Sequence, residues 1–570
     1  MPDTANVIAP SSGRAFPVTS IVTWVLCALT LGPFLIYPVA RVLMGALVQD
    51  GQFTPSLLLL PVNDPSAREA MRNSFVIGVA ATIVSALLAI PLAWFVARLR
   101  FPGKNFLTGL LLVPLLLPPL VGAVGLRQML GREGLINSLL REIGLIKEPI
   151  EFLQMQAPMV VIVMALHLYP LIYLNLSAAW ANIDPTLEEA GESMGASGWL
   201  LWRTITLPLL LPGFLAGALI VFIFAFVDLG TPLVFNYRQV AAVQIFDAKT
   251  TFNVVGYVLA FWMTVLAGGV FWISRRFLDG GRIATLSRAA TAGREQTARG
   301  WQLLLVYGVL GLVIFLALLP HIGVVLASFA RDWTSRLLPE WTLENYHRVF
   351  TDPTIPAANA IKISLLCATL SMLLDIIGGF FLAYALVRGK VWGRAFLDTI
   401  AMLPLALPGL ILAFGLLTGY IRTPLDPITY SPIPLLVISY AIRRLPYALR
   451  SVSGGLQQMS VTLEEASLNL GASPLQTVWQ VTRPLVMANL LAAGLLTFAF
   501  AVLEVSDSLV LAANRDYAPI AQAIFQLSIA TTGGTFLACA LGVVGMALLT
   551  FTFLLVNRLI GRQLGSLFRA

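Results

Sequence analysis

Charged residues are scarce in this chain of 570 residues. Asp, Glu, Lys and Arg together make up 11% of it, whereas hydrophobic residues make up 58% and the mean hydropathy is +0.85. So few charges leave too little polar surface to cover a soluble globule of this size. The composition therefore excludes an ordinary water-soluble protein and predicts a chain whose solvent is the lipid bilayer.

Cysteine and histidine are also rare, with three residues of each. The cysteines stand far apart in apolar runs without CxxC spacing, so we expect neither a disulfide nor a metal site from them. The histidines are too few for an imidazole metal cluster, and no Ser/His/Asp or Cys/His arrangement suggests catalysis. We therefore expect a chain that is not an enzyme and binds no cofactor or metal of its own. The residues are Cys27, Cys367, Cys539, His167, His321 and His347.

A phosphate-binding loop is missing as well. The pattern Gly-x-x-x-x-Gly-Lys-Ser/Thr does not occur, because neither Gly103-Lys104 nor Gly389-Lys390 is followed by Ser or Thr. If ATP drives this protein, the nucleotide must bind another chain. The net charge of +8 does not indicate nucleic acid, because the basic residues form short clusters beside apolar runs.

Long apolar runs are abundant. Crossing the hydrocarbon layer takes about 20 apolar residues, and about twelve such runs occur. The first is too long for a signal-peptide core and lacks an obvious cleavage site, so we interpret it as a retained span. Residues 277–300, rich in Arg, Gly, Ala and Thr, predict a solvated linker between six spans and six more. The expected spans are 19–47, 72–98, 106–130, 157–180, 208–229, 255–276, 301–328, 360–388, 395–420, 432–452, 485–511 and 530–558.

Basic residues gather in the connections that would be cytoplasmic if both termini were inside. The opposite orientation would place all of these clusters on the wrong side of the membrane. We therefore expect a multi-pass protein with both termini in the cytoplasm. The clusters are Arg98, Arg100 and Lys104; Arg388, Lys390 and Arg394; Arg275, Arg276, Arg282, Arg288, Arg294 and Arg299; and Arg558, Arg562 and Arg569.

The two halves are repeats of each other. Leu92-Ala93-Trp94 recurs 290 positions later as Leu382-Ala383-Tyr384, and further along the chain the offset falls to 276. The difference places a longer outside loop in the first half, around residues 131–156. We expect a first repeat over 1–276, a cytoplasmic linker over 277–300 and a second repeat over 301–570. Because each half has an even number of spans, the halves should be related by a pseudo-twofold axis along the membrane normal.

A polar stretch follows the fourth span of each half, at residues 186–197 and 462–473. Thr186 with Glu189, and Thr462 with Glu465, have the spacing of a capping box that starts a helix, and paired glutamates favour the positive end of that helix. Glycine can then supply a left-handed C-terminal cap, and serine an N-cap for a second short helix. Each stretch therefore predicts a helix–turn–helix hairpin. The cap residues are Gly195, Gly471, Ser197 and Ser473, and Pro474 suits a first helical turn; Pro208 and Pro484 mark the entry to the next span.

These hairpins resemble the cytoplasmic signature of binding-protein-dependent ABC import permeases, which reads EAA, three residues, Gly, nine residues, I-x-L-P. The first half departs from it only at Gly191, and the second half departs at Ser467, Val481 and Arg483. The resemblance implies an all-α membrane protein of two six-helix MetI-like repeats whose hairpins couple to a separate ATPase. The residues it assigns to this coupling are Glu188, Glu189, Ala190, Gly195, Pro208, Glu464, Glu465, Ala466, Gly471 and Pro484.

The same resemblance implies the partners. They are two copies of an ABC ATP-binding subunit, which would hold ATP and Mg, and a periplasmic substrate-binding protein, around a chain in the bacterial inner membrane. The fused form looks most like ferric-iron-type permeases, although relatives carry 2-aminoethylphosphonate, polyamines, thiamine or sugar phosphates. An ion-coupled carrier of the major facilitator type and a non-transporting scaffold are the alternative classes.

Charged residues inside spans are costly and are therefore candidates for function. Asp228 and Glu504 occupy equivalent positions of the two repeats, and Asp507 lies one helical turn beyond Glu504. Our hypothesis is that these three carboxylates line the outer part of a translocation path and favour a cationic substrate. The alternative is that they cap span ends or bind buried backbone donors.

The arginines near the end of the tenth span have a simpler interpretation. Arg443, Arg444 and Arg450 are interpreted as positive-inside anchors, with contact to the ATPase as the alternative. Asp375, inside the eighth span, is expected to form an interhelical hydrogen bond.

Overall fold

The computed structural model describes residues 18–49, 51–116, 118–279, 296–333, 337–352, 355, 357–389, 391–530 and 533–560. Nearly all of this described chain is helical. The strands found there are two-residue pairs: β1 (Val48–Gln49) runs antiparallel to β2 (Gln52–Phe53), and β3 (Leu99–Arg100) runs parallel to β4 (Gln296–Thr297). The expected all-α membrane class is confirmed.

Each expected span corresponds to a helix or a run of helices. By length and apolarity, eight helices among the described residues can cross a membrane, or up to 11 if each bent pair counts as one span. Helix α20 carries several arginines and is not among them. The first half has α1 (Val18–Leu31), η1 (Gly32–Ile36) and α2 (Tyr37–Gly45) as one span, then α4 (Pro65–Arg98), α5 (Lys104–Leu110) with η3 (Val113–Leu116) and α6 (Pro119–Leu130), α8 (Gln156–Ala181), α11 (Leu207–Val227) and α14 (Val254–Asp279); the second half has α15 (Trp301–Ser328), α17 (Ala357–Val387), α18 (Arg394–Ala406) with α19 (Gly409–Tyr420), α20 (Ile433–Gln458), α24 (Met487–Val502) and α27 (Gly534–Ile560).

The third span of each half is sharply bent, where the sequence predicted single spans over 106–130 and 395–420. The two parts meet at 95° in the first half and at 100° in the second. Pro118 and Pro408 stand directly before the second part of each pair. Proline lacks the N–H that would continue the helix and its ring clashes with the preceding turn, which explains the break.

The eleventh span is also shorter than expected. Its helix α24 ends at Val502, and a separate helix α25 (Ser506–Leu511) follows. Glu504 therefore lies in a break between two helices and not within a span.

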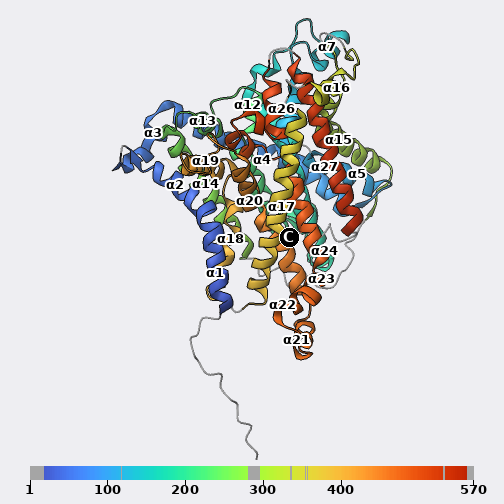
Figure 1. Cartoon of the computed structure of the whole chain (residues 1–570). Coiled ribbons are helices and arrows are strands. Elements are labelled where there is room, and N and C mark those ends of the chain that lie inside the picture. The colour runs from blue at the N-terminus through green and yellow to red at the C-terminus, as the bar shows by residue number, and fades with distance from the viewer. Residues whose placement is uncertain are drawn as a thin grey trace, which may run out of the picture.

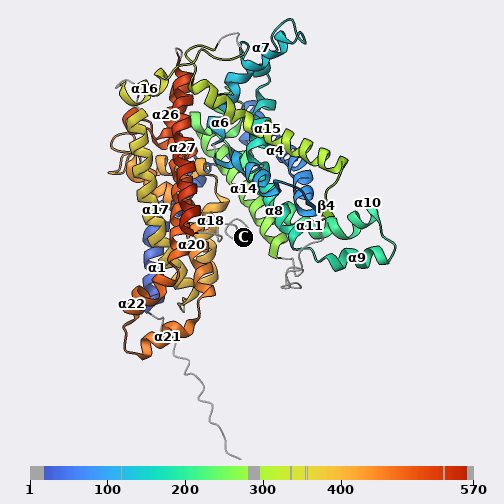
Figure 2. The same ribbon diagram turned by 90° about the vertical axis from the view of Figure 1, so that its right-hand side faces the viewer.

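Short elements gather at the two ends of the bundle (Figure 1). The loop at 131–156 is at the end opposite the hairpins, as predicted for an outer loop, and contains α7 (Figure 2). The other elements between spans are η2 (Pro55–Leu59), α3 (Leu60–Asn63), α7 (Leu135–Glu142), η4 (Phe152–Gln154), α12 (Gly230–Val234), α13 (Ala241–Ala248), α16 (Glu344–Thr351), η7 (Arg515–Tyr517) and α26 (Ile520–Ser528); the hairpin end has α9 (Pro185–Ser193), α10 (Gly198–Leu201), η5 (Trp202–Thr206), α21 (Val461–Asn469), α22 (Pro474–Thr477), η6 (Val478–Thr482) and α23 (Arg483–Leu485).

The halves exchange their first helices. Helix α2 packs on α19 of the second half (Figure 1), whereas α15, which opens the second half, packs on α6 of the first (Figure 2). The side-chain contacts match this exchange: the Trp24 indole N–H donates to the Trp392 carbonyl at 2.9 Å, and the Tyr307 hydroxyl donates to the Pro102 carbonyl at 2.9 Å. The repeats of the sequence are therefore not separate bodies in space.

Most of the expected linker, residues 280–295, lies outside the described residues, as do residues 1–17 and 561–570 at the termini. The end of the linker region returns to the first half, where β4 pairs with β3. Helix α1 begins at the same end of the molecule as the second hairpin (Figure 1). The cytoplasmic position of both termini stays a prediction.

The close crossing of α6 and α15 gives a test of the exchange. A Cβ added at Gly125 would lie 2.5 Å from the Pro320 carbonyl oxygen and 2.7 Å from the Val324 nitrogen, both backbone atoms of α15. We expect Gly125→Ala to reduce the stability of the protein by about 1–3 kcal/mol, as in other overpacked sites, and to lower the melting temperature in detergent. Gly311→Ala, on α15 itself, is the matched control, because a Cβ added there would meet no neighbouring atom within 4 Å. Equal melting temperatures would contradict the crossing.

Candidate functional site: the paired hairpins and the polar groups between the halves

The first hairpin begins two residues earlier than the sequence suggested. Asp184 is the N-cap of α9, and its carboxylate accepts a hydrogen bond from the Thr186 N–H at 2.9 Å. That backbone hydrogen bond lowers the pKa of Asp184 below its ordinary value. The predicted Thr186–Glu189 capping box is therefore wrong, because Pro185 at the first helical position fixes an earlier start.

The second hairpin departs in the same way. Ser460 caps α21 by accepting from the Thr462 N–H at 3.3 Å, so the predicted Thr462–Glu465 box is wrong as well. A full capping box does form at Ser473, where the Gln476 side chain completes it. The predicted N-cap at Ser473 is confirmed, whereas Ser197 occupies the N-cap of α10 without a side-chain hydrogen bond.

The turns of both hairpins follow the sequence prediction. Gly195 and Gly471 have φ of +88° and +92°, the left-handed conformation that favours glycine. Each glycine follows a large apolar residue at the tip, Met194 or Leu470, whose surface is 89% exposed. Trp199 on the first hairpin and Leu475 on the second are also exposed, by 70% and 78%, and several exposed apolar side chains on one element are typical of a surface that binds a partner. The acidic and small residues of the signature, Glu189, Ala190, Glu465 and Ala466, are also exposed on these hairpins.

The exits from the hairpins differ between the halves. The first hairpin runs through the π-turn η5 into α11 as one helical run from Gly198 to Val227, with Pro208 in the first turn of α11. The second is bent by 71° before Met487, so Pro484 lies in the short helix α23. The proline that was expected to mark the entry of the span does so directly only in the first half.

Glu188 and Glu464, the first glutamate of each adjacent pair, are buried and point inward. The Thr206 hydroxyl donates to the Glu188 carboxylate at 3.0 Å, and the Arg98 guanidinium also donates to it. In the second half, the Thr482 hydroxyl donates to Glu464 at 2.6 Å, and the Arg388 Nε lies 2.9 Å from that carboxylate. We call these two clusters the root triads: Arg98, Glu188 and Thr206, and Arg388, Glu464 and Thr482.

The sequence reasoning missed the role of these arginines and threonines. It treated Arg98 and Arg388 only as topology signals. The signal that could have found them is repetition: the arginines recur at the 290 offset, and the threonines and glutamates at the 276 offset.

Arg443 and Arg444 lie inside the second half and not at a membrane surface. The Glu504 carboxylate accepts from Arg443 at 2.6 Å and also from Arg444, which is 4% exposed. Their interpretation as positive-inside anchors is therefore wrong, because both are paired with a carboxylate at the break between α24 and α25. Arg450, by contrast, lies nearer the surface and pairs with Asp398 at 3.2 Å.

Asp507 and Asp375 are further buried carboxylates of this half. Asp507 accepts from the Ser439 hydroxyl at 2.9 Å and lies 3.3 Å from an Arg443 nitrogen. Neither oxygen of Asp375 makes a hydrogen bond within the described part of the chain. The interhelical hydrogen bond expected of Asp375 is thus absent there.

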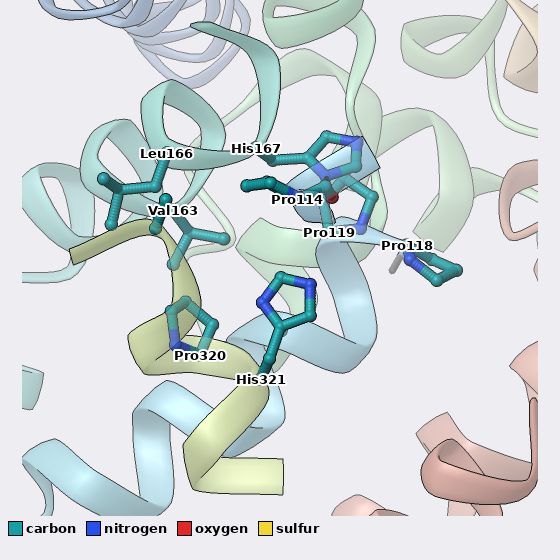
Figure 3. Close-up of a pocket in the computed structure, with 10 residues that line it drawn as sticks. Pro114, Pro118, Pro119, Val163, Leu166, His167, Pro320 and His321 are labelled. Carbon is teal, nitrogen blue, oxygen red and sulfur yellow. Dashed lines mark hydrogen bonds between the residues drawn. The ribbon is translucent and has the colours of Figure 1, made fainter. Parts of the chain in front are cut away.

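The first half has different chemistry at the equivalent place. The Asp228 carboxylate accepts from the Thr231 N–H at 2.8 Å, in the first turn of α12, and so binds a backbone donor, as the alternative interpretation expected. His167 stands where the second half has Arg443, and its Nδ1 lies 2.8 Å from the Pro114 carbonyl oxygen. His167 and His321 line a proline-rich pocket at the bend of the third span, with Pro114, Pro118, Pro119 and Pro320 (Figure 3).

The two polar sites meet where the halves meet. A Cβ added at Gly230, two residues after Asp228, would lie 3.1 Å from Val505, the neighbour of Glu504. The Lys249 ammonium group donates across the same boundary to the Leu509 carbonyl at 2.6 Å. Segments next to the equivalent acidic positions Asp228 and Glu504 therefore contact each other at the boundary of the two halves.

No resident metal site emerges from these groups. Among the described residues, no cluster of three or more His, Cys, Asp or Glu side chains is arranged to hold a metal ion. Cys27, Cys367 and Cys539 are buried free thiols in apolar surroundings.

Known proteins are similar to this chain over most of its length. The ferric transport system permease protein FbpB of Actinobacillus pleuropneumoniae is 25% identical over 487 residues, which cover 83% of this chain and 69% of FbpB. The putative ferric transport system permease protein FbpB 1 of Haemophilus influenzae is 26% identical, with 83% and 75% covered. The molybdenum transport system permease protein ModB of Haemophilus influenzae is 36% identical over 167 residues, 29% of this chain and 70% of ModB.

One protein family matches both halves, at residues 67–280 and 375–564, and each match contains one of the hairpins. The duplicated hairpins, the two bent third spans and the helical bundle are thus features of one transporter family, and not of a major facilitator carrier or a scaffold. The chain belongs to the family of binding-protein-dependent transport system inner membrane components.

Proposed function

We propose that this permease uses its two hairpins as coupling elements that seat on two copies of an ATP-binding subunit. The observation that carries the proposal is that the two hairpins project from opposite sides of the bundle, both far from α7 (Figure 2), and that each has an apolar tip residue that is 89% exposed. A symmetric pair of ATPase subunits would meet two equivalent tips. Closure of that pair around ATP would then rock the two halves and alternate access to a central path.

We propose ferric iron as the cargo, delivered by a periplasmic binding protein. The support is that the similarity to ferric permeases covers 83% of this chain, whereas the similarity to the molybdenum permease covers 29%. In this proposal iron is the substrate and not a resident cofactor. Specificity would depend on the binding protein as well as on the path.

Asp228, Glu504 and Asp507 remain our candidates for groups along the path. Their support is their position at the boundary of the halves, where rocking would change their surroundings. Glu504 and Asp507 have guanidinium partners, whereas Asp228 has no ion-pair partner among the described residues. Asp228 is therefore the group on which a cationic substrate would depend most.

The coupling proposal predicts the effect of a charge at either hairpin tip. We expect Met194→Asp and Leu470→Asp to abolish most co-purification of the ATPase, because burying a charge in place of an apolar interface anchor costs about 2 kcal/mol or more. Deleting residues 186–197 should have the same effect. The control is Leu145→Asp, because Leu145 is also a large, exposed apolar residue but lies in the loop at the end opposite the hairpins. Wild-type co-purification of both tip variants from the membrane would contradict the proposal.

The path hypothesis predicts the effect of removing one charge. We expect Asp228→Asn to lower iron uptake in proteoliposomes about tenfold, which corresponds to about 1.4 kcal/mol, because the amide oxygen can still accept from the Thr231 N–H but has no charge. Asp64→Asn is the matched control, since Asp64 caps α4 through the Ser66 and Ala67 N–H groups. Normal uptake by a normally assembled Asp228→Asn complex would end the hypothesis for this residue.

A further inference from the structure

Each hairpin is fixed at its root to the second span of its own half. Arg98 is the last residue of α4, and its guanidinium reaches the Glu188 carboxylate on α9. Thr206, the last residue of the π-helix η5 before α11, donates to the same carboxylate at 3.0 Å. One buried glutamate thus joins three segments: the second span, the hairpin and the start of the fifth span.

The second half builds the same junction independently. Glu464 on α21 is buried and meets Arg388, just after α17, and Thr482, the last residue of its π-turn. Arg388 also donates to the Leu456 and Met459 carbonyls at 2.8 Å each, at the end of α20. The repetition of residue types and partners in two halves that differ elsewhere indicates that the junction has a common task.

The root and the tip of each hairpin have opposite character. The tips are exposed and free to meet another protein, whereas the root glutamates are buried and bonded within the chain. A buried carboxylate of this kind is poorly placed to touch the ATPase. It is well placed to hold the hairpin at a fixed angle to the spans.

The spans joined at the root are central to their halves. Helix α4 packs along α8 and α11, and α17 packs along α20 and α24. A force applied to the tip would therefore reach the core of the half through the root, provided that the hairpin cannot swivel there. Without the ionic contact, the hairpin would keep the threonine hydrogen bond and its packing on η5 or η6, but no direct bond to the second span.

We propose that Glu188 and Glu464 are positioning residues that, through Arg98 and Arg388, transmit movement of the hairpins to the second span of each half. The proposal rests on the coupling function proposed above and adds the route by which the force enters the membrane bundle. It separates two properties of the hairpin: the tip binds the ATPase, and the root converts binding into movement.

The test uses the full chain co-expressed with its ATPase and binding protein and reconstituted in proteoliposomes. Three quantities are measured per assembled complex: co-purified ATPase, stimulation of ATP hydrolysis by the binding protein, and uptake of ferric iron. The variants are Glu188→Gln with Glu464→Gln, the milder Thr206→Val with Thr482→Val, and the exchanged pair Arg98→Glu with Glu188→Arg. Asp398→Asn is the control, because it removes a more exposed pair with Arg450 on the same protein.

We expect the glutamine variant to keep its ATPase within about twofold but to lose stimulation and uptake about tenfold, inside the range of ~5–150-fold typical of coupling between two sites. The threonine variant should also keep its ATPase, and should lose less stimulation and uptake than the glutamine variant. The exchanged pair should recover a large part of the loss caused by Arg98→Glu alone or Glu188→Arg alone, and the control should behave as the wild type.

Two results would overturn the inference. One is loss of ATPase co-purification by the glutamine variant, which would place the root glutamates in the docking surface. The other is unchanged stimulation and uptake per complex, even with a lowered melting temperature, which would make the triads purely structural. If the glutamine variant does not assemble, the same two outcomes are decided on the threonine variant. Failure of the coupling function itself would be seen in a different experiment: the tip variants Met194→Asp and Leu470→Asp would then bind the ATPase as the wild type does.

Discussion

The pairing of charges inside an apolar bundle is the constraint on which this structure depends. A charge left alone in such surroundings is expensive, which favours a partner of opposite charge or a place near an interface. Arg443 and Arg444 meet this requirement through Glu504, and Arg98 and Arg388 meet it through Glu188 and Glu464. These contacts tie particular spans to each other: α4 to the first hairpin, and α20 to the break after α24.

The hairpins show how one short motif serves two purposes. A helix of only two or three turns exposes one face to solvent and can bury another against the bundle. Here the exposed face ends in Met194 or Leu470, and the buried face has Glu188 or Glu464. Adjacent glutamates in the signature, such as Glu188 and Glu189, therefore have different surroundings: the first is bonded inside the chain and the second faces outward.

Duplication has preserved the hairpins more closely than the centre of the molecule. The root triads have identical residue types in both halves, whereas the central positions differ, with His167 in one half and Arg443 in the other. The two ATPase subunits proposed here would require equivalent docking and transmission in both halves. A single path between the halves has no such requirement, and its two walls can differ in charge.

The sequence by itself determined where the apolar spans lie, the repeat, the two hairpins and their glycine turns. These features depend on apolar run length, on residue spacing and on backbone preferences that act over a few residues, as the left-handed Gly195 and Gly471 show. Only the tertiary structure decided that α1 and α15 cross to the opposite halves, that Glu504 lies in a break and binds Arg443 and Arg444, and that Glu188 meets Arg98. The physical reason is that these contacts join residues about 60 to 370 positions apart, and their formation depends on which faces of the helices meet, which no local pattern specifies.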